Sequence, residues 1–422
     1  MIYKYHRIFL AFLVFLGTGF TQLKAEEALT WQDCIKEAAV NHPDLISAQE
    51  GVKESQASKK ITGSSAFPQI DSSASVSTAK ANGETTDNYS FGATATQLLF
   101  DGLKTRDNVK VASENIKAAE FNYKFVSSEV RLRLRTAFIN LLKTQELLKI
   151  TQDIYNIRRS NLELIALRYE SGIEHKGALL TAEANLAQAE FEIAQAKRAL
   201  EVAQRELIKE MGRTKFSPVQ AQGEFKISDV VLERPDFEKL ADKNPSLGKL
   251  MAQKDAASFG IKAAQANFFP QLSAQAGANR SGSSWPAQDS RWNAGLTLSF
   301  PIFEGGLRIA QVAKAEALFN QAKENERSAK DGIIVAIEQA WNTLQDAVET
   351  SEVEKKFLNA TQERAKIAEA QYSFGLIQFD NWTIIEDDLV RAKKAFLDAQ
   401  ANALLAQANW IQAKGETLEY AD

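Results

Sequence analysis

Two parts of the chain carry apolar residues in steps that alternate between three and four. The first series is Leu186, Ala189, Ile193, Ala196, Leu200, Ala203 and Leu207, and the second is Leu389, Ala392, Phe396, Ala399, Ala403, Ala406 and Trp410. This 3.5-residue period is that of a coiled coil, and the recurring alanines let helix axes approach closely. The preceding segments, about 103–168 and 307–371, carry a matching pattern. Because about 65 helical residues extend roughly 100 Å, the pattern predicts long helical hairpins.

Between these helices lie stretches that are poor in charge and alternate between apolar and polar residues. One face carries Ile70, Ser72, Ala74 and Val76 in the first stretch, and Trp292, Ala294, Leu296, Leu298 and Phe300 in the second. Alternation over about ten residues, with aromatic side chains at the ends, is typical of transmembrane β-strands. We therefore expect β-hairpins at about 68–100 and about 270–303. Ordinary hairpins that cap the helices of a soluble protein are the alternative.

Two hairpins supply only four strands, which are too few to close a barrel. An open sheet edge is not tolerated in hydrocarbon, so a membrane barrel needs strands from further copies of the chain. No segment after the first residues approaches the run of about 18 apolar residues that a transmembrane helix needs. The sequence thus predicts a mainly α-helical protein with a β-barrel portion that oligomerisation completes.

The chain is a tandem repeat. Asn41-His42-Pro43 returns as Lys243-Asn244-Pro245, and Pro245 lies 202 residues after Pro43. After one insertion the offset becomes 203, which relates Phe100 to Phe303 and Gly212 to Gly415. A constant offset over such a length indicates packed helices, because loops tolerate insertions and packed helices do not. We expect a signal peptide at 1–25, a first repeat at 26–212, a linker or equatorial segment at 213–235 and a second repeat at 236–422.

The first 25 residues have the features of a secretory signal peptide, with a basic start, a short apolar run and a cleavage-like ending. Removing Lys4, Arg7 and Lys24 leaves 47 basic against 54 acidic residues, a net charge of about −7 that argues against a nucleic-acid partner. The single cysteine, Cys34, lies nine residues too late for a lipid anchor. We expect it to be a buried thiol on an early helix.

Four short segments carry a family resemblance. They are Phe300-Pro301-Ile302-Phe303-Glu304-Gly305-Gly306, its weaker first copy Leu98-Leu99-Phe100-Asp101-Gly102, and the pair Arg168-Tyr169-Glu170-Ser171-Gly172 and Gln371-Tyr372-Ser373-Phe374-Gly375-Leu376. In order, spacing and duplication they resemble the outer-membrane efflux protein family of TolC-like channels. The resemblance implies a homotrimer in the outer membrane, with a twelve-stranded barrel and an α-helical periplasmic tunnel.

The resemblance also implies partners and a role. The partners are outer-membrane lipid, a periplasmic adaptor (membrane fusion) protein and an inner-membrane pump of the RND, ABC or MFS type. The role is a passive exit duct in a tripartite efflux pump or a type I secretion system. The exported substrate is not implied, because the pump selects it.

Within such a channel, the resemblance identifies the turns between the long helices as the periplasmic tip, where an adaptor docks and the pore is closed at rest. The tip residues here are Gly172, Ile173, Phe374, Gly375 and Leu376. The alternative is that both glycines only terminate helices, as glycine commonly does.

A pore gate is harder to place. TolC-like gates have aspartates six and nine residues after the second tip glycine, but those positions hold Asn381 and Ile384. Asp380 is the nearest acidic candidate, with Asn381 beside it. An N-cap for a helix that starts near Trp382 is the other role for Asp380.

Nothing in the sequence predicts catalysis, a cofactor or a metal site. His6, His42 and His175 lack metal-ligand spacing, and neither a nucleophile elbow nor a phosphate loop occurs. Two other non-enzymatic hypotheses remain, a periplasmic adaptor and a purely structural coiled coil. An adaptor would show one hairpin between lipoyl-like halves, and a coiled coil does not account for the alternating stretches.

Three arginines, Arg131, Arg133 and Arg135, lie on one predicted helix, and such a run usually forms a solvated face. Arg135 corresponds to Glu338 in the second repeat. A pairing of these opposite charges around the tunnel is the second interpretation.

Overall fold

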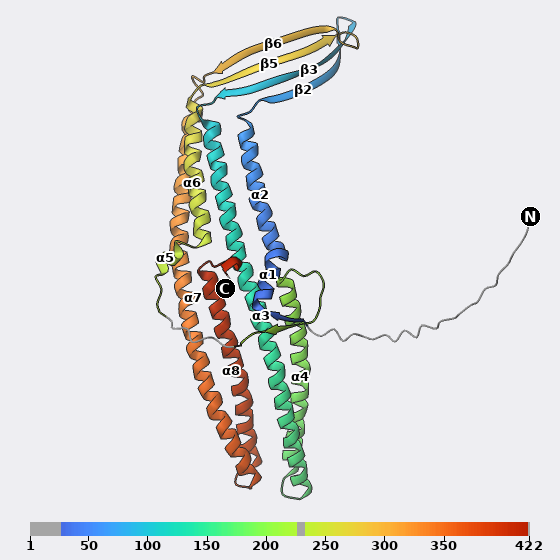
Figure 1. Cartoon of the computed structure of the whole chain (residues 1–422), viewed down its shortest axis with the longest axis vertical. Coiled ribbons are helices and arrows are strands. Elements are labelled where there is room, and N and C mark those ends of the chain that lie inside the picture. The colour runs from blue at the N-terminus through green and yellow to red at the C-terminus, as the bar shows by residue number, and fades with distance from the viewer. Residues whose placement is uncertain (1–26, 226–232, 421–422) are drawn as a thin grey trace, which may run out of the picture.

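The computed structural model describes residues 27–225 and 233–420, so the expected signal peptide at 1–25 lies outside the described residues. The described chain is elongated and mostly helical, with a β-sheet at one end and two helical turns side by side at the other (Figure 1). None of its described helices is long and apolar enough to cross a membrane.

Two very long helices run most of the length of the molecule. They are α3, Lys104–Glu170, and α7, Leu307–Ser373, each of 67 residues. Each turns back into a shorter helix, α4 at Lys176–Glu210 and α8 at Phe379–Ala413, each of 35 residues. At 1.5 Å per residue the long helices extend about 100 Å, which confirms the long helical hairpins that the heptad pattern predicts.

Shorter helices continue the lines of α4 and α8 toward the sheet. In the first repeat α1, Trp31–Asn41, leads into α2, Pro43–Ser64. In the second, α5, Phe237–Ala241, leads into α6, Pro245–Gln265. Both α2 and α6 pack against α3 (Figure 1).

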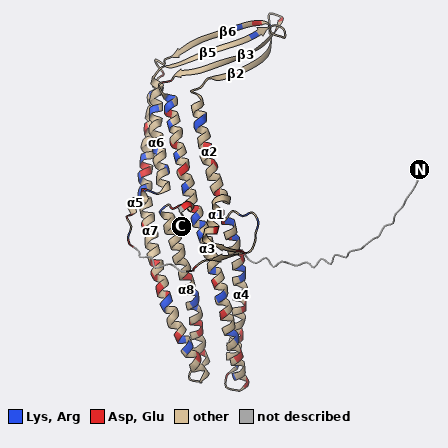
Figure 2. Ribbon diagram, in the orientation of Figure 1, with Lys and Arg blue, Asp and Glu red and all other residues tan. Residues whose placement is uncertain are grey.

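The large sheet has four antiparallel strands in the order β2-β3-β5-β6. The strands are β2 Gln69–Ala81, β3 Glu84–Phe100, β5 Gln271–Gly282 and β6 Asp289–Ser299. The second strand of the first hairpin pairs with the first strand of the second hairpin, for example Ala95 with Ala276. Figure 2 shows that Lys, Arg, Asp and Glu are spread along the helices and are sparse in the sheet. Within the described residues the sheet is open, because β2 and β6 each pair with one neighbour only.

Each repeat contains the same kind of tight joint. The end of α4 meets the start of α2 in the first repeat, and the end of α8 meets the start of α6 in the second. Gly212 follows α4 and Gly415 follows α8, and both have left-handed φ angles, 77° and 81°. A β-carbon at Gly212 would lie closer than 3.0 Å to the backbone of Asn41, and one at Gly415 would lie closer than 3.0 Å to Pro245. Glycine is therefore required here for its conformation and for its size.

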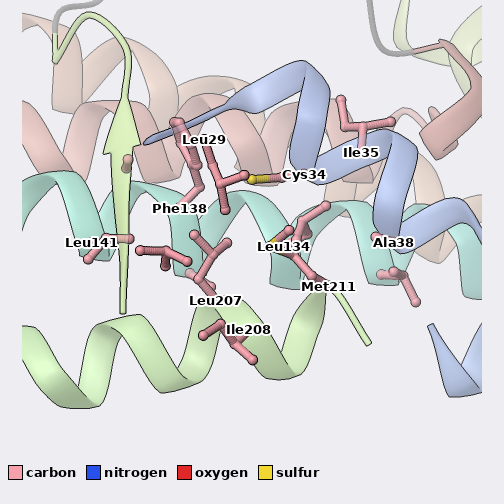
Figure 3. Close-up of a cluster of buried hydrophobic side chains, with 14 of the residues drawn as sticks. Leu29, Cys34, Ile35, Ala38, Leu134, Phe138, Leu141, Leu207, Ile208 and Met211 are labelled. Atoms are coloured by element: carbon pink, nitrogen blue, oxygen red, sulfur yellow. The ribbon is translucent and has the colours of Figure 1, made fainter. Parts of the chain in front are cut away.

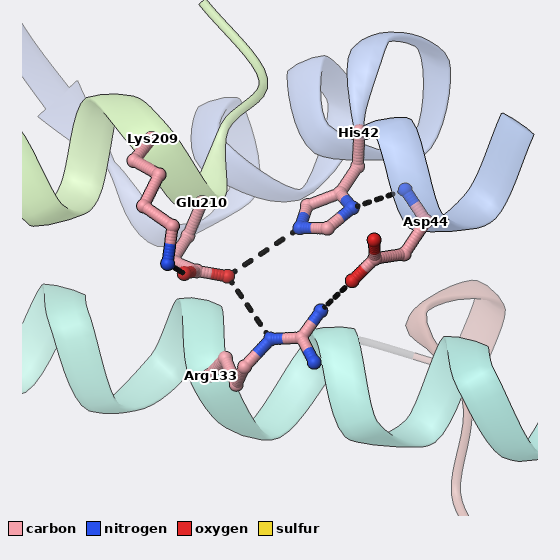
Figure 4. Close-up of polar contacts among 5 residues, drawn as sticks. All are labelled: His42, Asp44, Arg133, Lys209 and Glu210. Atoms are coloured by element: carbon pink, nitrogen blue, oxygen red, sulfur yellow. Dashed lines mark hydrogen bonds and ion pairs between the residues drawn. The ribbon is translucent and has the colours of Figure 1, made fainter. Parts of the chain in front are cut away.

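A polar cluster fastens this joint in the first repeat (Figure 4). The Nδ1 atom of His42 accepts a hydrogen bond from the backbone N–H of Asp44 and so caps α2. Its Nε2 atom lies 3.4 Å from the carboxylate of Glu210, which also accepts hydrogen bonds from Lys209 and Arg133. Burial alone raises the pKa of Glu210, but these hydrogen bonds outweigh burial and lower it. Arg133 also bonds to Asp44, so its charge is balanced on both sides.

The main hydrophobic core lies at the same level, where α1 and a small parallel sheet cover α3 and α4. That sheet pairs β1, Glu27–Thr30, with β4, Val219–Gln222. Figure 3 shows Leu29, Cys34, Phe138 and Leu207 directed into this core. Cys34 is fully buried, and burial raises the pKa of its thiol to about 12. The predicted buried thiol on an early helix is confirmed.

The arginine run on α3 does not form a solvated face, so that prediction is wrong. Arg131 bonds to Glu416 at 3.2 Å and to the carbonyl of Thr417 at 3.1 Å. Arg135 lies over the ring of Trp31, 4.8 Å from its centroid. The reason is that α1 and the end of the chain cover α3 here, which a helical period does not reveal.

Candidate functional site at the paired helical tips

The two turns between the long and short helices have the same local geometry. Gly172 and Gly375 both have φ = +73°. In the first turn Ile173 donates its N–H to the carbonyl of Arg168 at 2.9 Å, and in the second Leu376 donates to Gln371 at 2.8 Å. This six-to-one bond is the Schellman motif, in which a left-handed glycine satisfies the last carbonyls of a helix. Both glycines therefore terminate helices.

The structure brings both turns to the same end of the molecule, opposite the sheet (Figure 1). The apolar tip residues point outward, since Ile173 is 66%, Phe374 82% and Leu376 72% exposed. Exposed large apolar side chains on two neighbouring turns are typical of an interaction surface. Its use for adaptor docking stays a prediction.

Behind the tips an aromatic cluster holds the second turn in place. The rings of Tyr372 and Trp382 stack with centroids 4.4 Å apart and an interplanar angle of 11°. Phe379 packs edge-on against both rings. Ile165 of α3 and Ala178 of α4 close the cluster from the first hairpin. Aromatic pairs of this kind contribute about 0.5–1.5 kcal/mol beyond the area they bury.

Polar contacts join the same two hairpins at the tips. The hydroxyl of Tyr372 donates to Glu174 at 2.8 Å, and the guanidinium of Arg168 lies 4.7 Å from the centre of the Tyr372 ring. Burial is the main reason why the pKa of Tyr372 is raised, and the hydrogen bond to Glu174 adds to it. Its repeat counterpart, Tyr169, is 38% exposed. The repeated tyrosine thus has a linking role in one copy only.

Farther from the tips, charged pairs continue the junction between the hairpins. Arg158 of α3 bonds to Asp387 of α8, and Lys394 of α8 bonds to Glu192 of α4 at 2.8 Å. Beside them Glu386 is buried, and burial raises its pKa. Sequence reasoning missed these residues, because in the linear chain they are ordinary charges on two predicted helices.

The candidate gate residues lie at the start of α8. Asp380 and Asn381 are both exposed. The N-cap prediction for Asp380 is wrong, because α8 begins at Phe379 and Gln378 is its N-cap. The packing of Phe379 into the aromatic cluster extends the helix by one turn beyond the predicted start. Asp380 stands in the first turn, where a negative charge interacts favourably with the helix dipole.

In the part of the chain that the structure describes, no three His, Cys, Asp or Glu side chains are grouped to hold a metal ion. The geometry instead joins two hairpins through aromatic and ionic contacts and exposes apolar turns.

Comparison with known proteins identifies the family. The model of the family described as "Outer membrane efflux protein" matches residues 34–213 and 237–419. The chain belongs to this family. Outer membrane efflux proteins are channel proteins and not enzymes, so the protein is an outer-membrane component of an efflux system, located in the outer membrane with a periplasmic tunnel.

Several members of the outer membrane efflux protein family resemble this chain. The cation efflux system protein CusC of Escherichia coli (strain K12) is 24% identical over 384 residues, which cover 86% of this chain and 81% of CusC. The outer membrane protein TolC of the same strain is 22% identical over 423 residues, which cover 94% of this chain and 84% of TolC. The crystal structure of the Campylobacter jejuni CmeC outer membrane channel matches with a TM-score of 0.80 and 18% identity, over 93% of this chain and 87% of CmeC.

Proposed function

We propose that the chain is one protomer of a homotrimeric channel-tunnel, in which three four-stranded sheets close one twelve-stranded barrel. The observation that carries this proposal is the open sheet of an outer-membrane protein. Its two edge strands, β2 and β6, each lack a second neighbour among the described residues. Unpaired backbone groups are not tolerated in hydrocarbon, so each edge needs a strand from another copy.

The side chains of the sheet support this placement. Ile70 and Val76 on β2 and Trp292, Leu296 and Leu298 on β6 are all well exposed. The register places Ile70 level with Ala95, then Ala276 and Ala294, so the even-numbered apolar residues of β2 and β6 share one face. An apolar outward face is what contact with outer-membrane lipid requires.

In the proposed assembly the channel is a passive exit duct. An inner-membrane pump of the RND, ABC or MFS type delivers the substrate, and a periplasmic adaptor joins the pump to the tips at Gly172, Ile173, Phe374, Gly375 and Leu376. The role is that of a tripartite efflux pump or a type I secretion system. The exposed apolar side chains of the two turns support the docking assignment.

The candidate gate consists of Asp380 and Asn381, at the start of α8. Both residues are exposed and do not belong to the buried cluster that joins the two hairpins. Three symmetry-related copies of Asp380 around a narrow pore would attract cations and repel anions.

Disulfide formation between the edge strands tests the trimer. In a Cys34→Ser background, Leu296→Cys on β6 is combined in turn with Ile70→Cys, Ser72→Cys or Ala74→Cys on β2, and outer-membrane fractions are oxidised. Because these positions share a face, the pair whose register matches is expected to link chains into trimers on non-reducing gels. The matched controls carry one cysteine each. If every pair leaves only monomers while the protein remains in the outer membrane, the proposed barrel is wrong.

A further inference from the structure

One arginine in the middle of the molecule differs from its neighbours in the partners it has. Arg133 is bonded to Asp44 and Glu210, and Arg131 is bonded to Glu416. Arg135, one helical turn beyond Arg131, has no acidic partner among the described residues. The contacts of its guanidinium are aromatic, 4.8 Å from the ring centre of Trp31 and 5.8 Å from that of Phe138.

Its counterpart in the second repeat does not supply the missing charge. Glu338 bonds to Arg234 at 3.0 Å, so it does not pair with Arg135 within the chain. Burial lowers the pKa of Arg135, and the nearby charge of Arg131 lowers it further. Arginine nevertheless stays protonated in proteins, so the site keeps a partly desolvated positive charge.

Arg135 borders a cavity of about 180 Å³ between α1, α3 and α8. Its polar lining consists of Trp31, Ser128, Arg131, Arg135, Gln407 and Gln412. The lining residues therefore include two side-chain amides, the guanidinium of Arg131, which is already bonded to Glu416, and the guanidinium of Arg135, but no carboxylate. A guanidinium fork matches the two oxygens of a carboxylate or phosphate group, and the amides can donate further hydrogen bonds.

We propose that this cavity binds a small oxyanion, a carboxylate or phosphate group, through the guanidinium of Arg135. The guanidinium of Arg135 lies over the Trp31 ring, and the residue lines the cavity. Because α1 and α3 belong to the first repeat and α8 to the second, the bound anion ties the two repeats together at mid-height. The site is distinct from the tips and from the sheet, so it does not depend on the proposed channel function.

The anion comes from the solution around the channel, where a free carboxylate or phosphate group has the chemistry that the guanidinium of Arg135 binds.

Isothermal titration calorimetry on the full-length protein in detergent tests the proposal. Inorganic phosphate and acetate are titrated separately at constant ionic strength, with chloride as the background salt. Wild-type protein is expected to bind one of these anions per protomer, and Arg135→Gln should weaken binding about 10- to 100-fold, as expected for a charged hydrogen-bonding partner. Arg135→Lys keeps the charge but not the planar fork, so it should bind with intermediate affinity.

The matched control is Arg159→Gln on the same helix, whose side chain is 62% exposed and paired within the helix. It should bind as wild type does. Equal binding by wild type and both Arg135 variants overturns the proposal, and so does the absence of binding in every variant. Thermal melts in phosphate against chloride give a second readout should Arg135→Gln fold poorly, since only Arg135-dependent stabilisation supports the site.

Discussion

The pair of Arg158 and Asp387 gives the sharpest test of the junction between the two hairpins. It joins α3 to α8, and the Arg158 side chain is only 9% exposed whereas that of Asp387 is 44% exposed. Replacing Asp387 with Asn keeps the size of the side chain but removes its charge. Arg158 then stays close to the packed interface without its partner.

The expected loss lies between the values for buried and for exposed pairs. Hydrogen bonds to charged groups contribute about 1.5–3 kcal/mol, whereas exposed ion pairs contribute at most about 1 kcal/mol. Asp387 is half exposed, and the neighbouring Glu386 can balance part of the charge of Arg158, whose field acts on the Glu386 carboxyl. We therefore expect a loss of about 1–2 kcal/mol per protomer, which changes the ratio of joined to separated hairpins about 5- to 30-fold.

Single-channel recording in planar bilayers measures this change. If the hairpins must separate for the proposed tip to open, Asp387→Asn should increase the open probability or the conductance. Arg159→Gln removes an exposed pair from the same helix and should have no effect. In a double-mutant cycle with Arg158→Gln, the two changes should be less than additive because they remove one interaction. An Asp387→Asn protein that is correctly folded and conducts as the wild type would refute the reasoning.

Three other changes test separate parts of the structure. Gly415→Ala should lower the melting temperature more than Gly375→Ala. Both residues have left-handed φ angles, which cost a residue with a β-carbon about 1–2 kcal/mol, but only at Gly415 would the β-carbon also clash with a neighbour, Pro245. Glu386→Gln should stabilise the protein at neutral pH, because burial raises the pKa of the Glu386 carboxyl above 4.5 and the wild type therefore loses stability as the pH rises from there. If the melting temperatures of wild type and variant stay parallel between about pH 4 and pH 8, this prediction is contradicted. Asp380→Asn should reduce cation selectivity in bilayers, and unchanged selectivity would place the gate elsewhere.

The sequence predicts the long elements well because packing restricts them strongly. The offset of 203 residues relates α3 to α7 and α4 to α8, and the structure gives the members of each pair equal lengths. A gained or lost residue would rotate every later side chain out of the seam, so equal length is a consequence of the packing. The tip glycines are predicted for a similar reason, since both need left-handed φ angles that glycine adopts readily.

The contacts at the candidate site are not predictable in this way. Arg158 and Asp387 are 229 residues apart, a separation unrelated to the repeat. Heptad periodicity shows which face of a helix is apolar, but it does not show which helix covers that face. The start of α8 at Phe379 differs from the predicted start near Trp382, and Phe379 packs there against Tyr372 and Trp382, which are contacts that the linear sequence does not reveal.

In the proposed trimer, the helix contacts that α7 does not make within its own chain suggest how the copies are arranged. Within the chain α3 packs against α6 and α8. In the repeat, α3 corresponds to α7, α6 to α2 and α8 to α4. If α3 and α7 had equivalent environments, α7 would pack against α2 and α4. Among the described residues α7 makes no comparable contact with either helix.

Exposed apolar side chains occur on all three of these helices. They include Ile309, Val335 and Phe357 on α7, Ile61 on α2, and Leu180 and Phe191 on α4. In the proposed trimer, α7 of one copy and α2 with α4 of another would cover these residues mutually. Such an interface would be heterologous, and it forms a ring when the rotation between copies closes. The same neighbour would bring β2 beside β6, so in the proposed trimer the helices and the sheet use one and the same partner on each side of the chain.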